Sequence, residues 1–302
     1  MSKKHFLSYL KENNVFLDLP SQINFRMEGT TLVMVLSKKS ILENMQSDAA
    51  AFESWAILLK CNLYDKIDRV LISVGDNFSV DKDSLHYNRF LYRLDKFIKT
   101  YEWASTDHKI SLDFSDIVCN FPKQDAAKAE EWKQKDGEHV IECRFVEEKK
   151  SNYDILDHQL PVGLFHGNVS RTTHFTPGNL SQIDIWAVKN NEIYIFELKK
   201  PQNKPAGIIS ELMFYVNVID DILRHQIQYV PTKDLHKSIK KNFRGFGDFY
   251  RIYQLGEIRK IHAVFLADNL HSQITQNVIK LINSSARYKY SNIEFSWQKI
   301  NE

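Results

Sequence analysis

The sequence predicts an α/β protein made of two domains. Three observations favour this fold class: a hairpin at 182–200 that is apolar on both faces, strand-like and helix-like segments that alternate around it, and a composition that can form a large core. A hairpin with two apolar faces is typical of α/β layers, because both faces must be covered. The chain has 302 residues, of which 43% are hydrophobic and 26% charged, which suits one large or two ordinary globular domains.

Composition also excludes several classes of protein. The net charge of +2 provides no global basic field. No apolar run approaches the roughly 18 residues that a membrane span needs, and the opening MSKKHFLSYLKENN lacks the apolar core of a signal peptide. The three cysteines have neither CxxC nor zinc-site spacing: Cys61, Cys119 and Cys143. We therefore expect a cytoplasmic protein with reduced thiols and no membrane contact.

Charged residues interrupt two otherwise apolar strands in the stretch QIDIWAVKNNEIYIFELKK. Asn190 and Asn191 suit the left-handed backbone of a two-residue turn. With that turn, Asp184 lies opposite Glu197, with Cβ atoms about 4.5–5.5 Å apart. Lys199 shares their face, because side chains alternate along a strand. Buried charges are costly unless they are paired or bound to a metal, so two carboxylates at this spacing predict a cation between them.

The predicted cation is Mg²⁺, which suits one or two carboxylates together with waters and phosphate oxygens. Lys199 is placed to orient an attacking water or to offset negative charge on phosphorus. The pattern of Asp184, a hairpin and Glu197-Leu198-Lys199 resembles the PD-(D/E)xK motif of the restriction-endonuclease-like nuclease superfamily, with Ile183 where the motif's name has proline. The resemblance implies that Asp184 and Glu197 are metal ligands, that Lys199 is the catalytic lysine, and that Mn²⁺ substitutes for Mg²⁺.

The segments around the hairpin predict strands and helices in alternation. Before it we expect a strand at 138–148, a helix at 151–160, a strand at 162–170 and a loop at 171–182. After it we expect a helix at 205–224, a strand at 259–268, a helix at 272–285 and a strand at 292–299. Helix, three strands, helix and strand is the order that the resemblance implies. We therefore expect a nuclease-like domain at 138–302 with an αβββαβ core, whose mixed sheet is flanked by helices.

The resembled superfamily often carries a further acid on its first helix. Glu147, Glu148 and Asp154 are the candidates, and the periodicity does not choose among them. Glu211, early in the helix after the hairpin, is another. Each is more often a solvated or capping acid. His174, in the loop before the hairpin, suits a structural or a catalytic role equally.

The first 118 residues predict an α+β domain that resembles the second half. The stretch QINFRMEGTTLVMVLSKK matches the hairpin, and after it we expect a helix at 52–63, a strand at 69–75, a helix at 85–104 and a strand at 109–114. On this alignment Asn24 stands at the position of Asp184, Leu36 at that of Glu197, and only Lys38 remains. Without two carboxylates the copy holds no Mg²⁺, so we interpret it as a degenerate, non-catalytic repeat for dimerisation or substrate binding. The alternative is that strand-turn-strand-helix units look alike by chance.

Residues 119–137 are expected to form a connector with a short polar helix. Residues 231–260 form a basic segment, with eight Lys or Arg against three acids. Basic side chains contact phosphates, so we predict nucleic-acid contacts in this segment at Lys237, Lys240, Lys241 and Arg244. Aromatic residues are interleaved with them, and these suit base stacking if exposed or a small aromatic core if buried: Phe243, Phe246, Phe249, Tyr250 and Tyr253.

These features together predict a Mg²⁺-dependent nuclease that hydrolyses DNA phosphodiester bonds. We expect an endonuclease in restriction, repair or defence. One alternative is a catalytically silent nucleic-acid-binding or scaffold module of the same fold. Another is a nuclease that acts as a homodimer or with a partner subunit. The sequence does not distinguish DNA from RNA as the substrate.

Overall fold

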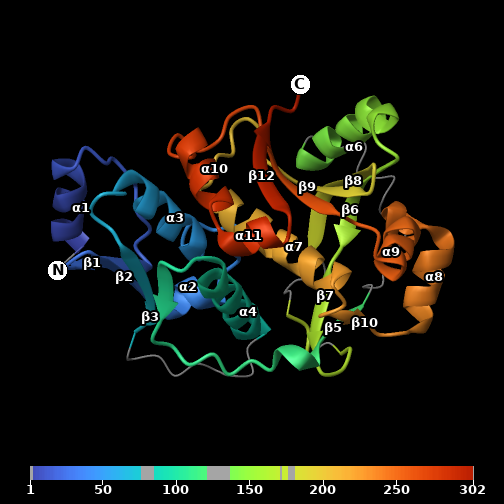
Figure 1. Ribbon diagram of the computed structural model, residues 1–302, viewed down its shortest axis with the longest axis horizontal. Helices are drawn as coiled ribbons and strands as arrows, with labels where there is room; N and C mark the ends of the chain where they lie inside the picture. The colour runs from blue at the N-terminus through green and yellow to red at the C-terminus, as the bar shows by residue number, and fades with distance from the viewer. Residues whose placement is uncertain (1–2, 76–84, 121–136, 171, 176–180, 302) are drawn as a thin grey trace. The chain divides into compact units, whose positions relative to one another are not determined.

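The chain is a mixed α/β protein, as the sequence predicts (Figure 1). A computed structural model describes residues 3–75, 85–120, 137–170, 172–175 and 181–301. The chain divides into two compact units: unit 1 is Met1–Leu112, Pro205–Glu211 and Leu270–Tyr290, and unit 2 is Asp113–Lys204, Leu212–Asn269 and Ser291–Glu302. Two segments from the second half of the sequence thus group with unit 1. The domain bounds expected from the sequence stay a prediction.

Unit 1 contains a four-stranded sheet in the order β1-β2-β3-β4. Strands β1 and β2 are antiparallel, whereas β2, β3 and β4 run parallel. The elements of this unit are α1 (Lys3–Glu12), β1 (Ile23–Glu28), β2 (Thr31–Leu36), α2 (Lys38–Leu42), α3 (Phe52–Asn62), β3 (Arg69–Val74), α4 (Leu85–Thr100), β4 (Ala104–Thr106), α10 (Gln276–Asn283) and α11 (Ala286–Tyr290).

Most of the elements expected in this unit are present. The predicted hairpin, first helix and first strand are confirmed as β1-β2, α3 and β3. The helix expected at 85–104 ends at Thr100, and the strand expected at 109–114 is wrong. The strand lies earlier, as β4, because Ala104 pairs with Val70 directly after the helix ends.

Unit 2 contains a five-stranded sheet in the order β12-β11-β9-β8-β6 and a three-stranded sheet in the order β10-β5-β7. In the larger sheet β12, β11 and β9 are parallel, and β8 is antiparallel to both β9 and β6. The elements of this unit are η1 (Phe114–Asp116), β5 (Ile117–Asn120), α6 (Glu138–Lys149), η3 (Lys150–Asn152), β6 (Ile155–Pro161), β7 (Gly163–His166), β8 (Gln182–Lys189), β9 (Glu192–Leu198), α7 (Ile208–Leu223, which begins in unit 1), β10 (Gln228–Tyr229), α8 (Lys233–Lys241), η4 (Phe243–Gly245), α9 (Phe246–Leu255), β11 (Lys260–Leu266) and β12 (Ile293–Gln298).

Two elements before the hairpin are exchanged relative to the prediction. The strand expected at 138–148 is helix α6, and the helix expected at 151–160 is strand β6. In α6, Ile141 and Phe145 are one helical turn apart and pack onto the core of the sheet, a period that the many β-branched and aromatic residues concealed. Strand β6 lies at the edge of its sheet, where Pro161 at its end is tolerated.

The other predicted elements of the second half are confirmed to within a few residues as β7, α7, β11, α10 and β12. The connector expected at 119–137 begins in β5, and its predicted helix falls at 121–136, outside the described residues. Of the helices that the structure describes, none combines the length and the apolar composition needed to cross a bilayer.

The sheets of the two units share one pattern. In each, a hairpin (β1-β2 or β8-β9) is followed by two further strands parallel to its second strand. Both hairpins close on two-residue turns, which fixes the alignment of one hairpin with the other. Counted from the turns, Ile23 rather than Asn24 occupies the position of Asp184, while Leu36 and Lys38 keep their expected positions. Descent of both units from one ancestor stays a prediction.

The η4 turn and helix α9 lie beside the edge strand β6, and α8 packs on α9 (Figure 1). The backbone between α8 and α9 is left-handed at Asn242 (φ 46°), Arg244 (φ 51°) and Gly245 (φ 71°). Trp186 of β8 holds this turn, because its Nε1 donates to the carbonyl oxygen of Arg244 at 3.3 Å and its ring meets Phe249 edge-on at 5.7 Å. The turn is therefore fixed against the sheet.

We expect Gly245→Ala to destabilise the protein more than Gly256→Ala. Both glycines are left-handed (φ 71° and 65°), so an alanine costs about 1–2 kcal/mol of backbone strain at either position. A Cβ at Gly245 would also lie 2.6 Å from the Trp186 ring and 3.2 Å from Asp157 Cβ, whereas a Cβ at Gly256 meets nothing within 4 Å. Urea denaturation should show about 1–3 kcal/mol of additional loss for Gly245→Ala. Equal losses would contradict this account of the turn.

Candidate functional site

The β8-β9 hairpin positions the residues of the predicted motif. Asn190 and Asn191 have left-handed backbones (φ 53° and 61°), as a two-residue turn of this kind requires. Pairing continues from the turn to Ile185↔Phe196 in the predicted register. One face of the hairpin packs with α6 and β6 in a common core. The alternation along β8 then puts Asp184 on the other face, at the end away from the turn.

The structure brings the three side chains of the motif together. Glu197 and Lys199 are 1% and 5% exposed, and their side chains form an ion pair. Asp184 is half-buried, and its Oδ2 accepts a hydrogen bond from the backbone N–H of Leu198 at 2.8 Å. Because Leu198 lies between the other two residues in the chain, this bond ties the carboxylate of Asp184 to the same end of β9.

Strand pairing is interrupted on both sides of Asp184. Counted from the turn, the β8-β9 ladder ends at Ile185, the neighbour of Asp184 in the chain. The β8-β6 ladder is interrupted at Gln159, which faces Asp184 between pairs that continue on either side. Gln159 is 2% exposed and has a φ of 57°, a conformation that costs a residue other than glycine about 1–2 kcal/mol. Such interruptions redirect side chains and are frequent next to active sites.

The structure identifies Glu142 as a further acid near the interrupted part of β6, and the sequence analysis missed it. Glu142 is 2% exposed on α6 and accepts a hydrogen bond from Nε2 of Gln159 at 2.8 Å. Of the expected candidates, Glu147 and Glu148 are exposed on the same helix, and Asp154 accepts a hydrogen bond from the hairpin turn, at the opposite end of β8. The helical period places Glu142 on the buried side of α6, but the prediction of a strand there concealed this signal.

Two further candidates have structural contacts. Glu211 is buried within unit 1, where it accepts a hydrogen bond from the side chain of Gln46. His174 forms a β-bridge with Phe165, and their rings stack at 4.9 Å. Burial lowers the pKa of His174, which favours its neutral form. These contacts support structural roles for both residues.

A polar network connects Glu142 to the end of α8. His139 Nδ1 lies 3.2 Å from Oε2 of Glu142, and Gln159 Oε1 accepts a hydrogen bond from Nη1 of Arg244 at 3.1 Å. The hydrogen bond to Glu142, together with the charges of Glu142 and Asp184, raises the pKa of His139. Burial lowers the pKa of Arg244 to about 10, and the charge of Glu142 opposes that fall. The five side chains therefore belong to one electrostatic group.

The basic residues predicted to contact nucleic acid fall into two kinds. Lys237, Lys240 and Lys241 are exposed on α8. Arg244 is half-buried, and its guanidinium is directed towards Gln159. The lysines therefore provide a basic surface, whereas Arg244 belongs to the polar network.

The aromatic residues of this segment mostly form a small core. Phe246 and Phe249 are fully buried, and Tyr253 is 9% exposed. Tyr229 of β10 meets Phe246 and Tyr253 edge-on, at 5.6 and 5.3 Å between ring centroids. The aromatic core is therefore confirmed for these residues, and base stacking by them is wrong, because packing within unit 2 covers their rings.

Asp184 and Glu197 are the carboxylates of the site that suit a divalent cation. In the described part of the chain, no three or more His, Cys, Asp or Glu side chains are grouped as a metal site. Mg²⁺ does not require such a group, because it is often bound by one or two carboxylates and keeps several waters. The donor set of Asp184 and Glu197 fits that mode of binding.

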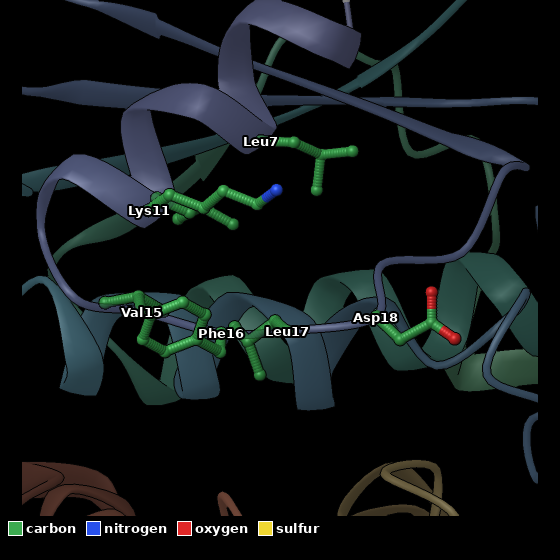
Figure 2. A pocket seen from close by; sticks show the side chains of 7 residues that line it. Leu7, Lys11, Val15, Phe16, Leu17 and Asp18 are labelled. Atoms are coloured by element: carbon green, nitrogen blue, oxygen red, sulfur yellow. The ribbon is translucent and has the colours of Figure 1, made fainter.

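A pocket of about 320 Å³ lies within unit 1, between α1 and the segment after it (Figure 2). Its lining is mostly apolar and holds none of the predicted site residues: Leu7, Leu10, Lys11, Val15, Phe16, Leu17 and Asp18. Figure 2 shows Leu7 and Lys11 on the helix, across the pocket from Val15 and Phe16. Asp18 is the single carboxylate of the lining, so the pocket offers no pair of carboxylates for a divalent cation.

Comparisons with protein-family models, curated proteins and solved structures gave no significant match to this chain. The functional argument therefore depends on the geometry of the site and on the resemblance of the hairpin to the PD-(D/E)xK motif.

Proposed function

We propose that this chain is a metal-dependent nuclease that hydrolyses DNA phosphodiester bonds, with Asp184, Glu197 and Lys199 as its catalytic residues. One observation carries the proposal. Two acids and a lysine from adjacent antiparallel strands meet where the β8 ladders are interrupted, at the end of a hairpin that is otherwise mostly buried and apolar. Burying these charges costs free energy, which a bound cation would reduce. Metal-assisted hydrolysis uses this combination of groups.

The arrangement of unit 2 supports the same proposal. With β7 and β10 set aside because they belong to the three-stranded sheet, and with the α8-α9 segment set aside, the order along the chain is α6, β6, β8, β9, α7 and β11. These strands lie in the larger sheet in the order β6-β8-β9-β11, with β12 beyond β11. Strand β8 is antiparallel to both β6 and β9, and β11 is parallel to β9. This agrees with the αβββαβ core of the restriction-endonuclease-like fold that the hairpin resembles. The motif thus stands on the second and third core strands, as the resemblance implies.

The carboxylates of Asp184 and Glu197 would hold Mg²⁺, for which Mn²⁺ would substitute. A bound divalent cation supplies an activated water and a Lewis acid for the phosphoryl oxygen. The backbone N–H of Leu198 orients the carboxylate of Asp184 towards the end of β9. The ammonium of Lys199 holds the carboxylate of Glu197 in place and provides positive charge for the phosphorane-like transition state.

The partner in this proposal is DNA, contacted through the exposed lysines of α8. Lys237, Lys240 and Lys241 share one short helix whose N-cap is Thr232, and they neutralise phosphates without base recognition. Action as an endonuclease, and assembly as a homodimer or with a partner subunit, stay predictions.

A specific observation also favours the second candidate, a catalytically silent nucleic-acid-binding module. Lys199 and Glu197 already pair with each other while almost fully buried, so these two charges are compensated without a metal. A module of this kind would bind nucleic acid through α8 and would not cleave it. Cleavage assays separate the two candidates.

The first prediction concerns cleavage. With Mg²⁺, the wild-type protein should cleave plasmid or single-stranded DNA. Asp184→Asn and Lys199→Met should each lower the rate by about 10²–10³-fold, because each removes charge that acts in the transition state. The matched control is Asp154→Asn, which lies at the turn end of the same hairpin and should cleave like wild type. Equal rates in all four proteins would indicate a contaminating nuclease and contradict the assignment.

The second prediction concerns DNA affinity. Binding of a DNA duplex without a divalent cation should weaken as salt rises, with a slope of about −0.9 for each phosphate neutralised. Lys240→Gln should flatten this slope by about one unit. Lys189→Gln, an exposed lysine at the hairpin turn, is the control and should leave the slope unchanged. If both variants leave it unchanged, α8 is not the DNA-binding surface.

A further inference from the structure

Arg244 differs from the other basic residues of its segment. Its Nη1 donates to both the side-chain and the backbone oxygen of Gln159, at 3.1 and 3.4 Å. Lys237, Lys240 and Lys241 are instead exposed to solvent on α8. The guanidinium of Arg244 thus binds strand β6 of the sheet, whereas the ammonium groups of these lysines face solvent.

Acids on two elements compensate the charge of Arg244 inside the protein. Glu142 of α6 and Asp157 of β6 both interact with it electrostatically, against the burial that lowers its pKa. A substrate phosphate would have to compete with these carboxylates. These interactions favour a structural role for Arg244 within the site over a contact with substrate phosphate.

The backbone aims Arg244 at the sheet. Its left-handed φ of 51° is unusual for arginine and costs about 1–2 kcal/mol. The hydrogen bond from Trp186 to its carbonyl oxygen holds it there, at 3.3 Å. Gly245 allows the close approach, because a Cβ at that position would collide with the ring of Trp186. The turn after α8 thus holds the backbone of Arg244 in the conformation that directs its guanidinium to Gln159.

The side-chain amide of Gln159 has one orientation that satisfies both Arg244 and Glu142, and in it Nε2 also lies 2.5 Å from Nδ1 of His139. A guanidinium only donates hydrogen bonds, so Oε1 of Gln159 faces Arg244. A carboxylate accepts them, so Nε2 faces Glu142 at 2.8 Å. A directed chain of hydrogen bonds therefore runs from Arg244 through Gln159 to Glu142. The middle residue of that chain is the one that faces Asp184 across the interrupted ladder.

We propose that Arg244 is a positioning residue of the nuclease: through Gln159, the residue that faces Asp184 across the interrupted ladder, it fixes the carboxylate of Glu142, and it does not bind substrate phosphate. This inference rests on the proposed function, because its main consequence is for the rate of cleavage. It gives the segment 231–260 two tasks. The lysines of α8 contact nucleic acid, and the turn that follows them fixes the site.

The test is steady-state cleavage by Arg244→Gln, compared with wild type over a range of salt concentrations. We expect kcat to fall by about 10- to 100-fold, as for other residues that orient groups at a metal site, with KM unchanged within about twofold. The salt slope of DNA binding should stay that of wild type. Lys240→Gln should give the contrasting result of a raised KM and a flattened slope. Lys189→Gln is the control that should change none of these quantities.

A second variant tests the chain of hydrogen bonds. Gln159→Asn keeps a residue that tolerates the left-handed backbone but shortens the side chain by one methylene, so its amide no longer spans Glu142 and Arg244. We expect the same loss of kcat as in Arg244→Gln. The double variant should lose no more than either single variant, because the two residues act through one chain. Losses that multiply in the double variant would overturn the proposal.

A readout without cleavage separates this proposal from the proposed function. In metal-free protein, NMR titration of His139, assigned with His139→Gln, should show a lower pKa in Gln159→Asn than in wild type, because the hydrogen bond to Glu142 that raises this pKa depends on the carboxylate that Gln159 holds. Lys189→Gln should not change this pKa. If wild type cleaves no DNA but this fall is observed, the proposed function fails and the positioning of Glu142 by Gln159 stands. An unchanged pKa in Gln159→Asn, or an unchanged kcat or a flattened salt slope in Arg244→Gln, would overturn the proposal.

Discussion

The pairing register of β8 and β9 is the constraint on which the rest of the site depends. Side chains alternate along a strand, so a slip of one residue would move Asp184 to the opposite face from Glu197 and Lys199. Two features prevent this slip. The Asn190-Asn191 turn admits only a tight two-residue connection, and the face packed against α6 is wholly apolar. The register therefore follows from turn chemistry and burial together, and it puts Asp184, Glu197 and Lys199 on one face of the hairpin.

The charges gathered at that point have an energetic cost that the surrounding structure offsets. Removing one partner of a buried ion pair such as Lys199–Glu197 typically costs about 3–5 kcal/mol, because the other charge is left buried and uncompensated. The left-handed Gln159 adds backbone strain, which its hydrogen bonds to neighbouring elements offset. Charge and strain of this kind in one place are typical of functional sites and rare in purely structural ones. A site that binds a divalent cation explains both features with one cause.

Local signals in the sequence predict the hairpin well and its surroundings less well. The period of two and the paired asparagines are contained within 182–200, and they predict the turn, the register and the meeting of Asp184 with Glu197. The segment of α6 carries β-branched and aromatic residues in a helix, because packing on the sheet outweighs intrinsic propensity there, and Glu142 was missed with it. The bond from Arg244 to Gln159 joins residues 85 positions apart, and both residues have left-handed backbones, which neither glutamine nor arginine favours. Contacts of this kind arise from tertiary packing alone.

The central claim is that Asp184 and Glu197 together bind a divalent cation, and calorimetric titration of the full chain with Mn²⁺, without DNA, tests it most directly. The account predicts binding by wild type that weakens by about tenfold or more in both Asp184→Asn and Glu197→Gln, since each replaces a charged ligand by a neutral one of the same shape. Asp154→Asn, at the other end of the hairpin, should bind like wild type. Undetectable binding by wild type, or equal binding in all four proteins, would contradict the account.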